Sequence, residues 1–196
     1  MSDVIAALMI DHANIAKILE LLESEILAIE VGKTPDYRLL QDIMCYMNQY
    51  PDRLHHPKED LIFAQLVRRY PTAHAVVNEI LDEHISIGLA GREFARMLSR
   101  SEVDSVDVRE GLGTAGFAYI RAQRQHMVLE EKKLFPMAET VLTDKDWQEI
   151  EGAVEAIEDP LFGAEIAKGY ERLYRLIIDQ SRSDAVSTSA DNHGVP

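Results

Sequence analysis

Two segments of the sequence each carry a histidine followed, four positions later, by a glutamate. The pairs are His55 with Glu59 and His126 with Glu130. On an α-helix, residues four apart share one face, with Cβ atoms about 5–6 Å apart, so both side chains of a pair reach one ion or two adjacent ions. Imidazole nitrogen and carboxylate oxygen suit iron and other first-row transition metals. These residue types at this spacing therefore predict metal binding.

Two more histidines occupy positions that the apolar pattern assigns to the inside of a helix. His12 fills the missing step between Leu8 and Ile15, and His84 lies one turn after Ile80. A lone histidine on an apolar face is more often a hydrogen-bonded core residue than a ligand. The coincidence of both with the two His-x-x-x-Glu pairs favours one shared metal site.

The glutamates of the pairs strengthen this interpretation. Glu59 and Glu130 fall on apolar faces that hold no lysine or arginine. An unpaired carboxylate is costly to bury, whereas one or two metal ions would satisfy both carboxylates. The competing interpretation for Glu130 is a charged outer face, because Glu131, Lys132 and Lys133 follow it. We favour the metal site, since four helical segments each place a histidine inside.

The other histidines are placed less directly. His56 would project about 100° away from His55 on a regular helix. A kink at Pro57 would rotate it inward, so the sequence leaves its ligation open. His74 lies nearly three turns from the expected site, and His193 lies in a polar C-terminal segment. Neither is expected to join the ligands.

Long helices must position these side chains. Apolar residues recur every three or four positions, which predicts an all-α fold, an up-and-down four-helix bundle with additional C-terminal helices. Pro51 and Pro57 predict kinks in the second helix, and the glycines at 111, 113 and 116 predict one in the fourth. The expected long helices span residues 3–30, 36–69, 72–100 and 105–141.

We expect the bundle to comprise residues 1–141. A helical extension over residues 142–180 is expected to pack on it. Its two helices are predicted over 143–157, with Thr143 as the N-cap, and over 162–180. Residues 181–196 are rich in Ser, Asp and Asn and are expected to form a disordered tail.

Composition excludes several classes of function. The formal net charge of −14 gives nucleic-acid and membrane binding little electrostatic support. The single cysteine, Cys45, excludes an internal disulfide and a multi-cysteine metal site. With no recognisable signal peptide and no long uncharged apolar stretch, we expect a cytoplasmic protein.

Four motifs together make the sequence resemble the hemerythrin-like, or HHE cation-binding, family of the bacterial type. They are Asp-His12-Ala-Asn, His55-His56-Pro-Lys-Glu59-Asp-Leu-Ile-Phe, Asp-Glu-His84, and His126-Met-Val-Leu-Glu130-Glu-Lys-Lys-Leu-Phe-Pro. The resemblance implies a non-haem, oxo- or hydroxo-bridged pair of iron ions inside the bundle, for which zinc or manganese can substitute. It implies a ligand set of His12, His55, His56, Glu59, His84, His126 and Glu130.

The sequence departs from the oxygen-carrying members of that family in the third and fourth helices. The carriers have two histidines four apart in the third helix, whereas Ile80 and Gly88 flank His84 here. We therefore expect the iron near His84 to have fewer nitrogen ligands. The carriers place the fourth-helix carboxylate five residues after its histidine, at Glu131 here, but the apolar seam favours Glu130. These departures favour sensing, redox reaction or iron release over reversible oxygen carriage.

Three functions follow as hypotheses, and none assigns a catalytic residue. The first is a di-iron protein that binds or senses oxygen or nitric oxide, or handles iron, and signals to a protein partner or a second copy. The second is a di-iron enzyme that acts on nitric oxide or peroxide, or an iron donor for iron–sulfur cluster repair. The third is a structural bundle with hydrogen-bonded core histidines.

Overall fold

The computed structural model describes residues 2–100, 106–154 and 158–180, all helix, turn or coil, with no strand among them. The chain forms two compact units, Met1–Ile157 and Glu158–Pro196. Each is described by itself. Within the described residues, no helix combines the length and the apolar character needed to cross a membrane.

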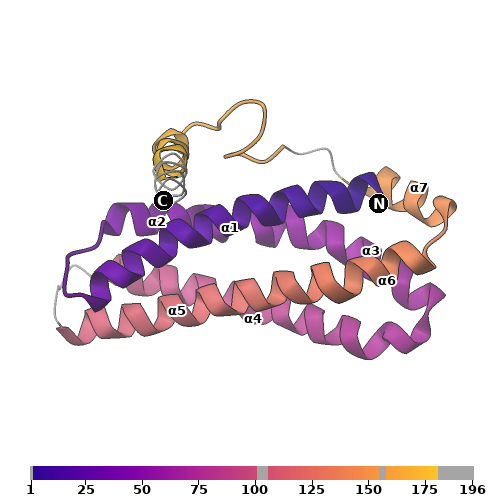
Figure 1. Ribbon diagram of the computed structural model, residues 1–196, viewed down its shortest axis with the longest axis horizontal. Coiled ribbons are helices and arrows are strands. Elements are labelled where there is room, and N and C mark those ends of the chain that lie inside the picture. Colours follow the sequence, from indigo (N-terminus) through magenta and orange to yellow (C-terminus); the bar gives the residue numbers. More distant parts are fainter. Residues whose placement is uncertain (1, 101–105, 155–157, 181–196) are drawn as a thin grey trace, which may run out of the picture. The chain divides into compact units, whose positions relative to one another are not determined.

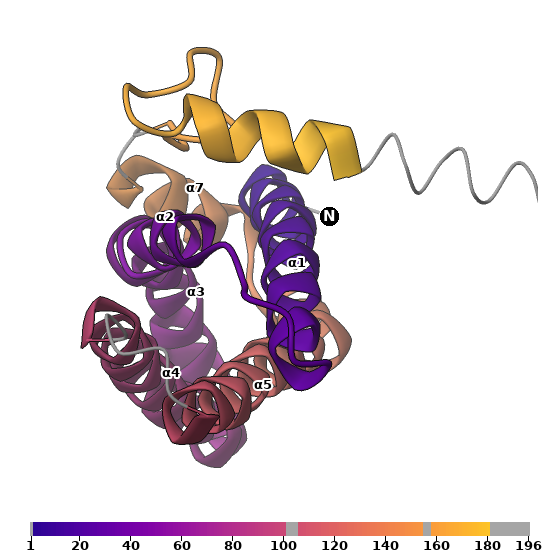
Figure 2. The same ribbon diagram turned by 90° about the vertical axis from the view of Figure 1, so that its left-hand side faces the viewer.

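The first unit is a bundle of four helical rods (Figures 1 and 2). The first rod is α1 (Asp3–Glu30), the second combines α2 (Tyr37–Met47) and α3 (His56–Arg69), the third is α4 (His74–Arg100), and the fourth combines α5 (Val106–Leu129) and α6 (Phe135–Val141). α1 contacts α2 and α5, α4 contacts α2, α3 and α5, and α3 contacts α6. The predicted helical bundle is thus confirmed.

The second and fourth rods are each interrupted by a π-helical turn, η1 (Pro51–His55) and η3 (Glu130–Leu134). Both turns end two residues before a proline, Pro57 and Pro136. A proline ring clashes with the carbonyl four residues earlier and supplies no N–H to it. That carbonyl lies inside the π-helical turn in each case, and the wider turn accommodates the clash.

The interruption of the fourth rod does not fall where the glycines predicted it. α5 runs unbroken through Gly111, Gly113 and Gly116. A Cβ at Gly116 would lie 2.5 Å from Cδ1 of Ile26 and 3.3 Å from Cζ of Phe94. This glycine therefore allows α5 to pack closely on α1.

α7 (Asp144–Ala153) closes the described part of the first unit. Thr143 caps it as predicted, in a reciprocal pair of hydrogen bonds with Asp146. Asp146 also accepts hydrogen bonds from Arg69 of α3, and Ile150 joins the apolar core. The predicted end of this helix, at 155–157, lies outside the described residues.

In the second unit, residues 171–180 are helical. The predicted start of this helix at 162 is wrong, because residues 160–169 form turns, bends and coil. Asp159 accepts hydrogen bonds from the backbone N–H groups of Leu161 and Phe162, and Gly169 has a φ of +106° that an α-helix does not permit. The predicted tail, 181–196, lies outside the described residues.

Candidate metal centre

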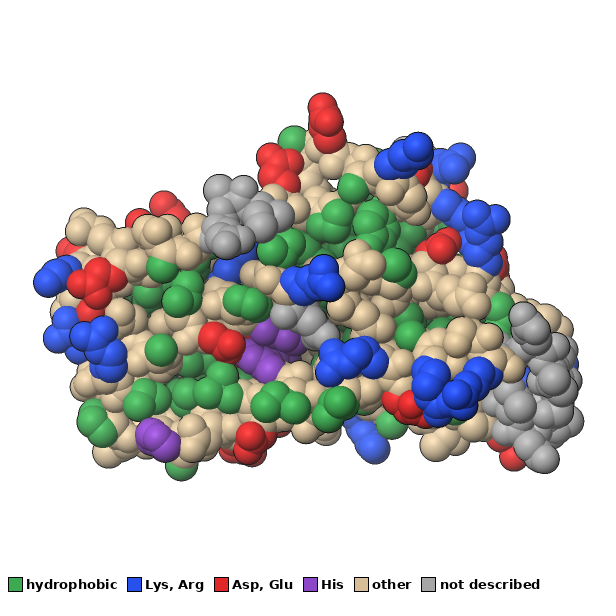
Figure 3. All heavy atoms as spheres, turned by 180° about the vertical axis from the view of Figure 1, so that it is seen from behind, with side chains coloured by type: hydrophobic (Ala, Val, Ile, Leu, Met, Phe, Trp, Pro, Cys, Tyr) green, Lys and Arg blue, Asp and Glu red, His purple; other side chains and the backbone are tan. Residues whose placement is uncertain are grey.

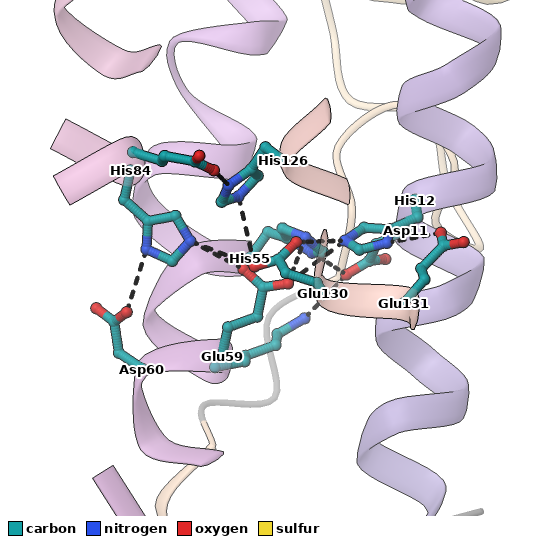
Figure 4. A network of polar contacts seen from close by, with 11 residues as sticks. Asp11, His12, His55, Glu59, Asp60, His84, His126, Glu130 and Glu131 are labelled. Atoms are coloured by element: carbon teal, nitrogen blue, oxygen red, sulfur yellow. Dashed lines mark hydrogen bonds and ion pairs between the residues drawn. The ribbon is translucent and has the colours of Figure 1, made fainter. Parts of the chain in front are cut away.

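All seven of the residues predicted as ligands converge in the middle of the first unit, and Figure 4 labels every one of them except His56. Each rod contributes at least one of them. Glu59 and Glu130 are completely buried, and the side chain of His84, the most exposed of the seven, is 8 % exposed. The set comprises His12 on α1, His55 at the end of η1, His56 and Glu59 on α3, His84 on α4, His126 at the end of α5, and Glu130 at the start of η3.

The π-helical turns determine which residues face the centre. η1 ends at His55, and both His55 and His56 are buried although they are adjacent in sequence. η3 begins at Glu130, which is buried, while the adjacent Glu131 lies behind His12. The inward rotation of His56 before Pro57 thus occurs, and Glu130 is the inner carboxylate of the fourth rod.

The potential ligand atoms fall into two groups that share Glu59. One contains His56, His84 and His126, the three-imidazole group, and the other contains His12 and His55, the two-imidazole group. Within each group the atoms lie within 4.8 Å of one another. Three imidazoles surround the position near His84, because the wide turn before Pro57 brings His56 to that side.

The two glutamates lie between the groups. Oε1 of Glu59 is 3.4 Å from Nε2 of His12 and 3.2 Å from Nε2 of His55, while its Oε2 is 3.5 Å from Nε2 of His84. Glu130 is placed in the same way, with Oε2 3.4 Å from Nε2 of His12 and Oε1 3.4 Å from Nε2 of His126. Each carboxylate thus offers one oxygen to each group.

These separations fit the donor set of a metal ion. A ligand bond of about 2.0–2.2 Å places neighbouring donor atoms roughly 3.0–3.5 Å apart around one ion. The contacts of Glu59 and Glu130 with the imidazoles, at 3.2–3.5 Å, lie in or near that range. The residues present therefore fit a buried metal site with imidazole and carboxylate ligands.

Without an ion, the centre must balance its charge with protons. Burial alone would lower the pKa of His12 and His84, but nearby carboxylates outweigh it and raise the pKa to about 10 for His12 and about 11 for His84. Burial would raise the pKa of Glu59, yet His55 and the neighbouring imidazoles hold it well below its usual value. Burial and the charge of His84 lower the pKa of His56. In the absence of an ion, the protons on His12 and His84 supply positive charge that balances the buried carboxylates.

A second layer of carboxylates, which was not predicted from the sequence, lies behind the imidazoles. Nδ1 of His12 lies 3.0 Å from Glu131, and Nδ1 of His55 lies 3.2 Å from Asp11. A signal for this layer was present in the sequence, because each of its members is the direct neighbour of an expected ligand. The layer comprises Asp11, Asp60, Glu83 and Glu131.

The centre reaches solvent on one side. Asp60 and Glu83, which contact His84 and His126, have side chains 49 % and 37 % exposed. Histidine side chains are visible in the middle of the face in Figure 3. His74 is exposed at the start of α4, as expected of a histidine outside the site.

Comparison with known proteins agrees with this geometry. No individual curated protein matches the chain. The sequence model of one family, the hemerythrin HHE cation binding domain, matches residues 3–138. That range covers the bundle as far as Ala138 in α6 and includes every side chain of the centre. The match extends over more than half of the chain. The chain therefore belongs to the hemerythrin HHE cation-binding domain family.

Proposed function

We propose that this chain binds two iron ions and uses them to bind or sense a small diatomic ligand, oxygen or nitric oxide. The observation that carries the proposal is a set of buried atoms for which the described residues offer no hydrogen-bond partner. They are both carboxylate oxygens of Glu59 and Glu130, the Nε2 atoms of His12, His84 and His126, and Nδ1 of His84, which has Asp60 only at ion-pair distance. Buried polar groups are almost always hydrogen-bonded, so these converging atoms call for a bound cation.

The proposed ligands are the seven side chains of the centre. His56, His84 and His126 would serve one ion, His12 and His55 the other, and Glu59 and Glu130 would bridge them. Iron suits this mixture of imidazole and carboxylate, although zinc or manganese can occupy such a site because the affinity order does not favour ferrous iron. When bound, an iron pair supplies a reversible redox change and a coordination position for a diatomic molecule.

The difference between the two groups supports a place for that molecule. Each bridging carboxylate offers one oxygen to each side, so the three-imidazole group holds one more donor than the two-imidazole group. The proposed position for a small ligand is therefore beside His12 and His55. All four rods contribute ligands, so a change in ligation there would shift the helices that hold them. A protein partner or a second copy would respond to that shift.

Iron handling is a second candidate function, and one observation favours it. Asp60 and Glu83 lie behind imidazoles of the three-imidazole group and are partly exposed. Such carboxylates offer a cation a short route between solvent and the centre. Donation of iron to a damaged cluster, or turnover of nitric oxide or peroxide, would use the same ligands.

Anaerobic reconstitution with ferrous iron tests the proposal. We expect about two irons per chain by metal analysis, followed by a change in the optical spectrum when oxygen or nitric oxide is added. A reversible change supports binding or sensing. Loss of iron to a chelator on oxidation supports iron handling, and continued consumption of peroxide or nitric oxide supports an enzyme.

Variants identify the ligands. Glu59→Ala and His126→Ala are expected to lower the iron content and the thermal stability together, because an ion that binds the folded state stabilises it. Glu23→Ala is the control, since Glu23 pairs with Arg124 away from the centre. Unchanged iron content in both ligand variants, or fewer than one iron per wild-type chain, would refute the assignment.

A further inference from the structure

Four outer carboxylates stand behind four of the imidazoles, all at Nδ1. Glu131 lies 3.0 Å from His12 and Glu83 lies 3.1 Å from His126. Asp11 lies 3.2 Å from His55. Asp60 contacts Nδ1 of His84 at 3.2 Å, an ion-pair distance. In every case Nε2 is left directed at Glu59 or Glu130.

Each of these carboxylates comes from a different rod than the histidine it contacts. Asp11 on α1 reaches His55 in the second rod, and Glu131 in the fourth rod reaches His12 on α1. Asp60 on α3 and Glu83 on α4 reach the third and fourth rods in the same way. The four contacts therefore tie the rods together around the centre.

We infer that Asp11, Asp60, Glu83 and Glu131 are positioning residues, which orient four imidazoles for a pair of metal ions. The inference rests on the proposed two-metal function. An ionised carboxylate only accepts hydrogen bonds, so Nδ1 must carry the proton and Nε2 must present its lone pair to an ion. A carboxylate behind a ligating histidine fixes the ring and makes the imidazole a stronger donor.

The ring of carboxylates divides into two pairs, and each pair serves one group. Asp60 and Glu83 support His84 and His126 of the three-imidazole group, whereas Asp11 and Glu131 support the two-imidazole group. Asp11 is itself held in place, because its carboxylate accepts a hydrogen bond from the hydroxyl of Tyr50 and lies 3.6 Å from Nζ of Lys58. Each pair should therefore control the affinity of its own ion.

Zinc affinity of the full chain, measured by competition with a coloured chelator, tests one member. Glu83→Leu removes the acceptor behind His126, and we expect zinc to bind one of the two positions about 10–100-fold more weakly. Glu83→Gln keeps an acceptor oxygen without the charge, so its loss should be smaller. This partial rescue would not occur if Glu83 only filled space or stabilised the fold.

Glu23→Gln is a matched control for Glu83→Gln. Both remove one charge from a glutamate that makes a contact between rods, and the two side chains are 32 % and 37 % exposed. Because Glu23 pairs with Arg124 and not with the centre, its variant should bind zinc as the wild type does. An equal loss in both variants would reduce the effect to net charge and overturn the inference.

Two double variants test the division into pairs. We expect Asp60→Asn with Glu83→Gln to weaken one zinc position and Asp11→Asn with Glu131→Gln to weaken the other. Bound Co²⁺ should show a different visible spectrum in each, since the spectrum reports the ligand field. If both double variants kept the wild-type affinity and spectrum, the positioning role of the outer carboxylates would be overturned, while the proposed two-metal function would stand. Failure of the wild type to bind two ions would instead overturn the proposed function.

Discussion

Metal loading should release protons from the centre, and the structure predicts how many. In the metal-free protein, Glu130 and Glu59 raise the pKa of His12 to about 10 against the effect of burial. Asp60, together with the same two glutamates, raises the pKa of His84 to about 11. Both imidazoles are therefore protonated at pH 7. A protonated imidazole has no lone pair for a metal ion, so both must lose a proton when they ligate.

The magnitude follows from this count. Each proton displaced changes the free energy of binding by about 1.4 kcal/mol per pH unit, so two protons correspond to about a hundredfold change in affinity per pH unit. A group with a raised pKa holds its proton throughout the range below that pKa. Between pH 6 and 9, zinc or ferrous affinity should therefore weaken steadily as the pH falls. The pKa of His55 is also raised, which adds to the release.

Calorimetric titration with zinc in buffers of different ionisation enthalpy counts the protons directly. We expect about two or more protons released per chain at pH 7, together with tighter binding at pH 8 than at pH 7. The Glu23→Gln variant should release the same number, because it leaves the centre intact. Release of less than one proton, or an affinity that does not change between pH 6 and 8, would refute the charged imidazole–carboxylate centre.

Three substitutions extend the predictions from the centre to the helices that hold it. Glu130→Ala should lower bound iron below two per chain and reduce the metal-dependent stabilisation, which is about 2.7 kcal/mol for one ion at a metal concentration of 100 Kd. Glu131→Gln should keep two ions at lower affinity. Equal metal content and affinity in the two variants would contradict the inner and outer assignment. Gly116→Ala should lower the free energy of unfolding in urea by about 1–2 kcal/mol, because the new Cβ meets the first helix at 2.5 Å. Gly152→Ala, which meets nothing within 4 Å, should not be destabilising, and equal losses would refute the packing argument. Thr143→Ala should cost about 1 kcal/mol by removing the capping box, and an unchanged urea midpoint would contradict that role.

The parts of the fold that depend on local pattern were predictable from the sequence. The apolar period identified the four rods, and α1 begins and ends at the predicted residues. Thr143 and Asp146 identified the start of α7 because capping is a short-range effect. The apolar pattern along each helix is also local, and it correctly placed His12 and His84 on the inward side.

Tertiary geometry could not be derived in the same way. A regular helix would point His56 away from His55, and only the wide turn before Pro57 brings both inside. The sequence also suggested that glycines would break the fourth rod, whereas Gly116 packs closely on α1. The outer carboxylates were missed because each one contacts a histidine on another rod, and no spacing within a single helix indicates such a contact.

The two π-helical turns link the position of prolines to the composition of the centre. Both lie on the rods that carry the inner carboxylates, and both end two residues before Pro57 or Pro136. A π-helical turn admits one extra residue, which shifts the face that follows it and allows consecutive residues to serve one site. Thus His55 and His56 both enter the centre, while Glu130 enters it and Glu131 supports His12 from behind. α1 and α4 are unbroken, and each sends a single histidine inside. The turn before Pro57 therefore accounts for the asymmetry of three imidazoles against two, because it adds His56, whereas the turn before Pro136 adds no imidazole.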